Sequence, residues 1–215
     1  EVICQALCLP ADLYRQPKPD PALLDARPEG QACHDVGQLY RQRVKGVYGD
    51  LLAFMGRLAA PLDEEYQRFW TNSRLAALQL VNAVKDAKHL QKNLGPRLRE
   101  GDTPLRAAYV ELRRNLFWQI VALREIAWTA RETSEWTERL AALDGRVEAQ
   151  DARQRERLFE LMREGAIDGL EAGSLLNDQV YAARIYANLR QSLDNTREPG
   201  SLRRLRQRAR DEAVA

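Results

Sequence analysis

Two segments of the chain, residues 80–94 (LVNAVKDAKHLQKNL) and residues 175–189 (LLNDQVYAARIYANL), align with each other without a gap. Identical residues occur in five pairs: Leu80 and Leu175, Asn82 and Asn177, Ala87 and Ala182, Asn93 and Asn188, and Leu94 and Leu189. Leucine and alanine recur in any helical bundle, whereas asparagines in matched register inside a helix do not. The repeat therefore predicts a duplicated helical unit.

The composition favours helices along the whole chain. It has 215 residues, of which 30% are charged, and β-branched or alternating apolar runs are scarce. A chain of this length can bury a substantial core as one large or two small domains. The net charge is only +2 and both signs are interspersed, so the charge pattern indicates no nucleic-acid partner. We expect an all-α protein.

Prolines and glycines divide the sequence into three regions, residues 1–30, 31–133 and 134–215. The first region combines the end of a helix with an irregular, proline-rich connector. Each of the other two regions is expected to contain three helices, so that the second repeats the first. A polar stretch at residues 144–157 is expected to be either a solvent-exposed helix or a break. A short arginine-rich helix should follow Pro199.

Local signals set the boundaries of the helices in the 31–133 region. The apolar residues of its first helix follow the alternating four-and-three spacing of a helix that packs against partner helices: Tyr40, Val44, Val47, Leu51, Phe54 and Leu58. Gly95 and Pro96 are expected to end the second helix. Asp102 or Thr103 should cap the third helix, with Pro104 in its first position.

A polar stripe accompanies each copy of the repeat. Its members are spaced i, i+4, i+7 and i+11, which holds them on one face of a helix. They are Asn82, Asp86, His89 and Asn93 in the first copy and Asn177, Tyr181, Arg184 and Asn188 in the second. Such a face can be a binding site or docking surface on a pseudo-twofold axis. It can also be a hydrogen-bond ladder that fixes the register of two helices, and this structural interpretation is favoured.

Two basic segments could attract anionic partners. Lys85, Lys88 and Lys92 adjoin the first polar stripe and could attract phosphate or an acidic partner, although such a stripe is more often a solvated helix face. The arginines between Arg203 and Arg210 could make a weak contact with anionic headgroups of an inner membrane leaflet. Aromatic residues that would stack on bases are absent there, so no nucleic acid is expected.

Metal and catalytic sites are not indicated. Cys4, Cys8, Cys33 and His34 could form a zinc site, but their spacing is unlike common structural zinc motifs and a proline-rich connector separates the two pairs. Cys4 and Cys8 are therefore interpreted as helix-packing residues, and three cysteines suit a reducing compartment. No nucleophile elbow, P-loop or HExxH motif occurs. We expect no enzyme activity, no metal and no cofactor.

The repeated segments resemble a known family. VNAVKDAKHLQKNL and LLNDQVYAARIYANL are similar to the cytosolic PhoU-like region that follows the membrane domain in bacterial sodium/phosphate cotransporter family proteins. YRQRVKGVYGDLLAFMGRL is similar to the first helix of that region, and the likeness covers residues 33–195. The resemblance implies two tandem three-helix bundles at the cytoplasmic face of the inner membrane. It also implies a regulatory, non-catalytic role in phosphate uptake.

The chain departs from the family pattern at the metal-binding positions. PhoU proteins bind metal clusters through acidic pairs spaced E/D-x-x-x-D, because hard cations need several converging carboxylate oxygens. At the corresponding places this chain has Asn82 with Asp86, and Asn177 with Tyr181. Asp178 lies one residue off the stripe. No metal cluster is therefore expected.

The resemblance also implies a partner and leaves two other functions open. The partner is the membrane domain of the same transporter, upstream of Glu1, which agrees with a sequence that begins without Met. A homodimer is an open alternative, because wide apolar helix faces can pair between chains. The other functions are a free-standing PhoU-type phosphate-signalling regulator and a metal- or anion-binding helical protein.

Overall fold

A computed structural model describes residues 1–28, 35–57, 64–128 and 134–196. Every regular element in these residues is helical, which confirms the predicted all-α class. The elements are α1 (Val2–Ala6), η1 (Leu13–Arg15), α2 (Pro21–Asp25), α3 (Val36–Leu39), the π-helical turn η2 (Tyr40–Val44), α4 (Lys45–Gly56), α5 (Glu64–Arg99), α6 (Pro104–Trp128), α7 (Ser134–Arg163) and α8 (Gly169–Asn195). The predicted sixth helix lies outside the described residues.

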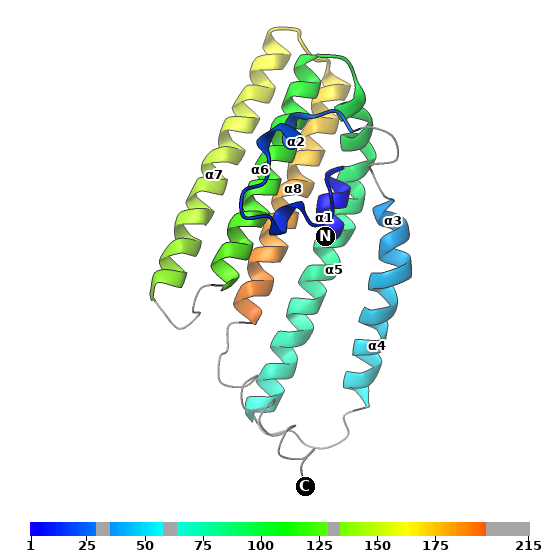
Figure 1. Ribbon diagram of the computed structural model, residues 1–215, viewed down its shortest axis with the longest axis vertical. Helices are drawn as coiled ribbons and strands as arrows, with labels where there is room; N and C mark the ends of the chain where they lie inside the picture. Colours follow the sequence, from blue (N-terminus) through cyan, green and yellow to red (C-terminus); the bar gives the residue numbers. More distant parts are fainter. Residues whose placement is uncertain (29–34, 58–63, 129–133, 197–215) are drawn as a thin grey trace.

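The four long helices α5, α6, α7 and α8 form an up-and-down bundle (Figure 1). α3, η2 and α4 follow one another without a break and lie along α5, on the side away from α6 and α7. The N-terminal segment, with α1 and α2, lies across α5 and α6. α5 therefore has two flanks, one covered by α8 and the other by α3 and α4.

Two apolar clusters fill the interior of the bundle. The larger cluster joins α5, α6 and α8 and includes Leu94, Leu116 and Leu175. The smaller cluster surrounds Trp136 near the start of α7. At the edge of this cluster the hydroxyl of Tyr186 in α8 donates a hydrogen bond to Asp144 in α7 at 2.6 Å.

The π-helical turn η2 changes which side of α4, the next helix, faces α5. The sequence pattern predicts that Val47 and Phe54 pack against partner helices, but both are exposed. The half-buried positions of α4 are instead Tyr48, Leu51 and Met55. A π-helical turn inserts one extra residue into the helical ladder and rotates everything after it. The predicted stripe is therefore wrong at Val47 and Phe54, whereas Leu51 keeps its place on the half-buried side and Leu58 lies outside the described residues.

α5 does not end at Gly95 and Pro96, as the sequence predicts, but continues to Arg99. A proline removes one backbone N–H and crowds the preceding turn. Only three residues of α5 follow Pro96, so little of the helix lies beyond the turn that the proline disturbs. Leu94 and Leu98 are both fully buried on either side of the proline, and their packing holds the last turn in the helix.

The N-terminal region, which is irregular apart from α1, η1 and α2, packs into the fold. Leu13 and Leu24 are fully buried in the larger cluster. The buried Arg113 of α6 donates hydrogen bonds to the carbonyl oxygens of Leu24 and Ala26, the latter at 2.7 Å. Burial lowers the pKa of Arg113 to about 10. A buried guanidinium needs such acceptors, so this contact fixes α2 against α6.

Other predicted boundaries agree with the structure. Thr103 caps α6 by accepting a hydrogen bond from the backbone N–H of Arg106 at 3.1 Å, and Pro104 is the first residue of that helix. The polar stretch at residues 144–157 is an unbroken part of α7, and most of its side chains face solvent. None of the helices in the described ranges has the length and apolar composition that a membrane crossing requires.

Candidate functional site

The two polar stripes meet across the interface between α5 and α8. These helices run antiparallel (Figure 1), so residue numbers that rise along α5 meet numbers that fall along α8. A carboxylate oxygen of Asp86 lies 3.1 Å from the guanidinium of Arg184, and its other oxygen accepts a hydrogen bond from Asn188 at 3.5 Å. The rings of His89 and Tyr181 stack with centroids 5.3 Å apart. Five of the eight stripe residues therefore touch a stripe residue of the other copy.

Asp86 lies at the inner edge of this interface. Its side chain is 4% exposed, whereas that of Arg184 is 59% exposed, so the guanidinium reaches the carboxylate from the solvent side. Burial raises the pKa of Asp86, and the neighbouring charges of Arg184 and Lys85 oppose that shift. The attraction within such a pair is largely offset by the cost of burying the carboxylate. The pair therefore specifies the alignment of the two helices more than it stabilises the fold.

Asp178 forms the second buried carboxylate site between the repeats. It is 0% exposed, and the hydroxyl of Tyr109 in α6 donates a hydrogen bond to it at 2.7 Å. Burial raises the pKa of Asp178, while hydrogen bonds from Tyr109 and Asn93 oppose the shift. Burial, the hydrogen bond to Asp178 and its charge all raise the pKa of Tyr109. Asn93 of the first stripe thus meets the second repeat here.

Reasoning from the sequence missed the importance of Asp178. The predicted stripe on α8 runs through Asn177, which directly precedes Asp178, but Asn177 is exposed. Asn82, its counterpart on α5, is only half-buried. Asp178 instead shares the buried face of α8 with Leu175, Ala182 and Ile185. The sequence does contain a signal for this site, since Asp178 lies on an otherwise apolar helical stripe and a buried carboxylate needs a specific partner.

The basic stripe of α5 lies beside α3. Lys85 and Lys92 are exposed, and Lys88 is half-buried. The aliphatic stem of Lys88 approaches Gly37 of α3, where a Cβ atom would lie 3.5 Å from it. Lysines pack their stems along a neighbouring helix while the ammonium stays in water. The stripe therefore contributes to the contact between α3 and α5 and presents two free-standing lysine side chains to solvent.

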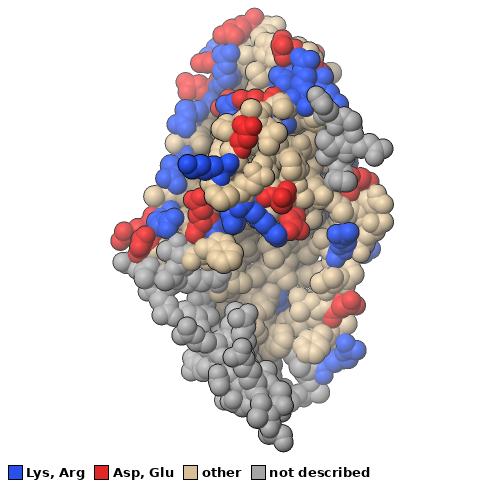
Figure 2. All heavy atoms as spheres, viewed as in Figure 1, with Lys and Arg blue, Asp and Glu red and all other residues tan. Residues whose placement is uncertain are grey.

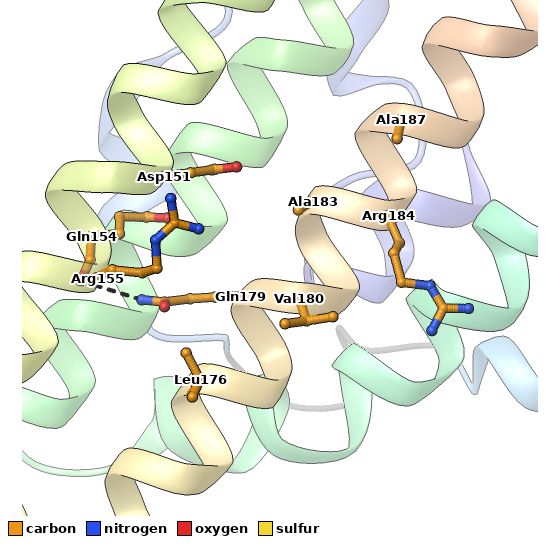
Figure 3. Close-up of a pocket in the computed structure, with 9 residues that line it drawn as sticks. All are labelled: Asp151, Gln154, Arg155, Leu176, Gln179, Val180, Ala183, Arg184 and Ala187. Carbon is orange, nitrogen blue, oxygen red and sulfur yellow. Dashed lines mark hydrogen bonds between the residues drawn. The ribbon is translucent and has the colours of Figure 1, made fainter.

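A groove of about 280 Å³ lies between α7 and α8 (Figure 3). Leu176 and Val180 line it from α8, and Asp151 and Arg155 point into it from α7. Burial raises the pKa of Asp151. Arg184 also borders the groove, but its side chain points away from α7 (Figure 3). The volume lies at the small end of the range for ligand pockets.

The cysteines do not form the zinc site that the sequence leaves open. Cys4 is a buried free thiol, and Cys8 is disulfide-bonded. The interpretation as a helix-packing residue fits Cys4 but not Cys8, which lies beyond the end of α1 and is disulfide-bonded. Cys33 and His34 lie outside the described residues. Within the described ranges, no group of three or more histidine, cysteine or acidic side chains is placed to hold a metal ion.

No protein-family model matches the chain, and no curated protein or solved structure matches it. By class, the described part of the molecule is an all-helical bundle in which α5 and α8 meet through a polar interface. Arg203 and Arg210, like the rest of the arginine-rich segment, lie outside the described residues.

Proposed function

We propose that the chain is a non-catalytic, PhoU-like regulatory domain of a sodium-dependent phosphate cotransporter, built from two tandem three-helix repeats. Its place would be the cytoplasmic face of the inner membrane, against the membrane domain of the same transporter. It would modulate phosphate uptake and need no cofactor. The proposal starts from the sequence resemblance of residues 33–195.

The observation that carries the proposal is the pairing of the two repeated helices with each other. In a duplicated bundle, equivalent helices face each other around a pseudo-twofold axis. The contact of Asp86 with Arg184 and the stacking of His89 on Tyr181 join equivalent stretches of α5 and α8 in antiparallel order. This pairing supports the proposal.

The same interface suggests how regulation would work. α5 belongs to the first repeat and α8 to the second, so a relative shift of the repeats would separate Asp86 from Arg184. Separation would leave the carboxylate without its charged partner in a buried position, which is costly. The interface would therefore favour two discrete arrangements. An effector or the membrane domain could shift their populations only by binding one more tightly than the other.

The test is phosphate uptake by cells that express the complete reading frame. Uptake of labelled phosphate should respond to the phosphate status of the cell, and Asp86→Ala should change that response at equal protein level. Glu148→Ala, at an exposed position of α7, is the matched control and should leave the response unchanged. Identical uptake with and without residues 1–215 would contradict the regulatory role.

The compartment can be tested separately at Cys8. Disulfides persist in oxidising compartments and are rare in the cytosol, and Cys8 is disulfide-bonded in the structure. Alkylation of thiols in intact cells, followed by mass spectrometry, measures its state where the protein resides. A free Cys8 thiol in cells would support the cytoplasmic face. A disulfide in cells would contradict that placement without affecting the fold.

The complete reading frame distinguishes a free-standing PhoU-type regulator from a domain of a transporter. A reading frame without hydrophobic spans before residue 1 would favour it over a transporter domain. In that case, co-purification with a separate transporter should depend on Asp86 in the way that uptake does in the first test.

A further inference from the structure

The groove between α7 and α8 opens on a side of the bundle away from the covering segments. The N-terminal segment lies across α5 and α6, and α3 and α4 lie along α5, so neither covers the groove. In Figure 3 the groove lies between α7 and α8, with α6 behind it. We propose that this groove packs against the same groove of a second copy of the chain and so forms a homodimer. The proposal goes beyond the regulatory function above and does not depend on it.

α8 contributes an apolar row to the groove. Four of its residues line the groove at the spacing i, i+4, i+7 and i+11, namely Leu176, Val180, Ala183 and Ala187. Leu176 and Val180 are 39% and 50% exposed, whereas Leu175 and Ile185 on the inner face of α8 are buried. This spacing is that of a helix face that packs against another helix. Large apolar side chains that stay exposed along such a face mark an interaction site.

α7 contributes one charge of each sign. Asp151 and Arg155 lie one helical turn apart and both point into the groove (Figure 3). Asp151 is half-buried and Arg155 is exposed, and no ion pair or hydrogen bond joins either side chain to another described residue. A half-buried carboxylate is costly unless a cation pairs with it. The groove therefore offers a carboxylate and a guanidinium that a partner could satisfy.

Charged side chains on the opposite face of the bundle are used within the chain. Figure 2 shows the face on which the N-terminal segment lies, and acidic and basic side chains are interspersed there. Some of them form ion pairs that tie this segment to the bundle, such as Arg27 with Asp102 at 2.8 Å. The unpaired charges of the groove therefore contrast with charges that the fold itself pairs.

A twofold axis brings complementary groups of two grooves together. When two copies of one helix pack antiparallel around such an axis, residues at equal distances on either side of the axis face each other. Asp151 faces Arg155 of the second copy if the axis crosses α7 at position 153, midway between them. Leu176 faces Ala183 of the second copy if the axis crosses α8 between positions 179 and 180.

The structure places these two crossing points at the same level of the groove. The side-chain amide of Gln179 donates a hydrogen bond to the backbone carbonyl of Gln154 at 3.5 Å, so position 153 of α7 lies beside position 179 of α8. One axis therefore gives two ion pairs and two contacts of a large with a small side chain. This self-complementarity favours a second copy of the chain over an unrelated helix.

The test is sedimentation equilibrium of the full chain from low micromolar to submillimolar concentration. The apolar row spans about 17 Å of α8 at 1.5 Å per residue. This is narrow for an interface, so the dissociation constant of the dimer should lie in the micromolar range. Val180→Asp should weaken the dimer by at least about tenfold, because it places two carboxylates beside the axis.

A charge swap tests the register of the two copies. Asp151→Arg should also weaken the dimer by at least about tenfold, because the new guanidinium faces Arg155 of the second copy. Asp151→Arg combined with Arg155→Asp restores opposite charges across the axis and should bring the dissociation constant back to within about threefold of the wild type. Leu170→Asp, at an 84% exposed position of α8, and Arg153→Asp, at an exposed position of α7, are the matched controls and should change nothing.

Cross-linking locates the axis directly. A residue beside a twofold axis lies close to the same residue of the second copy. Val180→Cys should therefore be joined to its counterpart by a short bismaleimide, whereas Leu170→Cys should not. The unchanged chain, which has cysteines of its own, sets the background.

Three outcomes would overturn the proposal. The first is a monomer over the whole concentration range. The second is a dimer that Val180→Asp and Asp151→Arg leave intact, which would place the interface elsewhere. The third is a charge swap that fails to restore the dimer although circular dichroism shows the helix content of the wild type. The same spectra for each single variant keep unfolding from imitating dissociation.

Discussion

The two flanks of α5 are packed very differently, and the more apolar covering helix, α4, is the less buried one. Toward α8, polar groups find partners and the apolar residues between them are buried, as at Asp86 and Ile185. Toward α4, no residue of the covering helix is fully buried. Burial therefore follows from matching patterns on two helices rather than from apolar composition alone, and η2 shifts the pattern of α4 out of register.

The largest expected difference between the flanks comes from truncating an apolar side chain. Leu94→Ala should lower the free energy of unfolding by about 2–5 kcal/mol, because Leu94 is fully buried and its loss leaves a cavity. Val47→Ala on α4 should change it by less than about 0.5 kcal/mol. Urea unfolding followed by circular dichroism measures both. Similar losses for the two variants would show that α4 is packed as tightly as the α8 flank.

The next difference comes from removing a hydroxyl. Tyr109→Phe should cost about 1–3 kcal/mol, because it removes one of the donors to the buried carboxylate of Asp178, the hydroxyl at 2.7 Å. Tyr48→Phe on α4 is the matched control and should cost less than about 0.5 kcal/mol, since its environment is only half-buried. If Tyr109→Phe were as mild as the control, the hydrogen bond to Asp178 would not matter for stability.

The sequence predicted the helical class and the α8 flank far better than the α4 flank. Patterns such as the i, i+4, i+7 stripe of Asp86, His89 and Asn93 depend only on the geometry of a regular helix. The structure keeps α5 regular there, so these residues share one face. η2 is a π-helical turn, and no residue type in its sequence predicts one. The side of α4 that faces α5 could therefore not be derived from the sequence.

Long-range contacts were also beyond the sequence. Asp178 meets Tyr109 only because α6 lies against α8, and helix periodicity says nothing about which helices are neighbours. The same holds for Arg113, whose partners are backbone carbonyls of Leu24 and Ala26. Every residue has a backbone carbonyl, so the sequence does not show which carbonyls accept such hydrogen bonds. The sequence therefore does not show that the proline-rich region is bound to α6.

The pH dependence of stability tests the buried carboxylate of the α8 flank. The fold raises the pKa of Asp178 above its ordinary value of 3.8, so the native state binds its proton more tightly than the unfolded chain does. The free energy of unfolding should therefore fall as pH rises from about that ordinary value through the raised folded pKa, and stay lower above it.

Asp178→Asn removes this titration but keeps an acceptor for Tyr109. The variant should be more stable than the wild type at neutral pH, and the difference should vanish at pH below the ordinary aspartate value. Each pKa unit of the shift corresponds to about 1.4 kcal/mol. Asp50→Asn, on the exposed side of α4, controls for the general effect of removing one negative charge. A difference between variant and wild type that is constant with pH would contradict the argument.

The smallest expected difference between the flanks is in the coupling free energy of one aromatic pair on each. His89 and Tyr181 stack at an interplanar angle of 17° in the contact with α8, whereas Phe54 and Trp70 are tilted at 53° between α4 and α5. Double-mutant cycles to alanine should give a coupling free energy of about 1 kcal/mol for the first pair, since packed aromatic pairs are worth roughly 0.5–1.5 kcal/mol. The second pair should couple by less than about 0.5 kcal/mol, because Phe54 is half exposed and can relax into solvent when Trp70 is removed. A cycle in which Phe54 and Trp70 couple more strongly than His89 and Tyr181 would mean that α4 is held to α5 as firmly as α8 is.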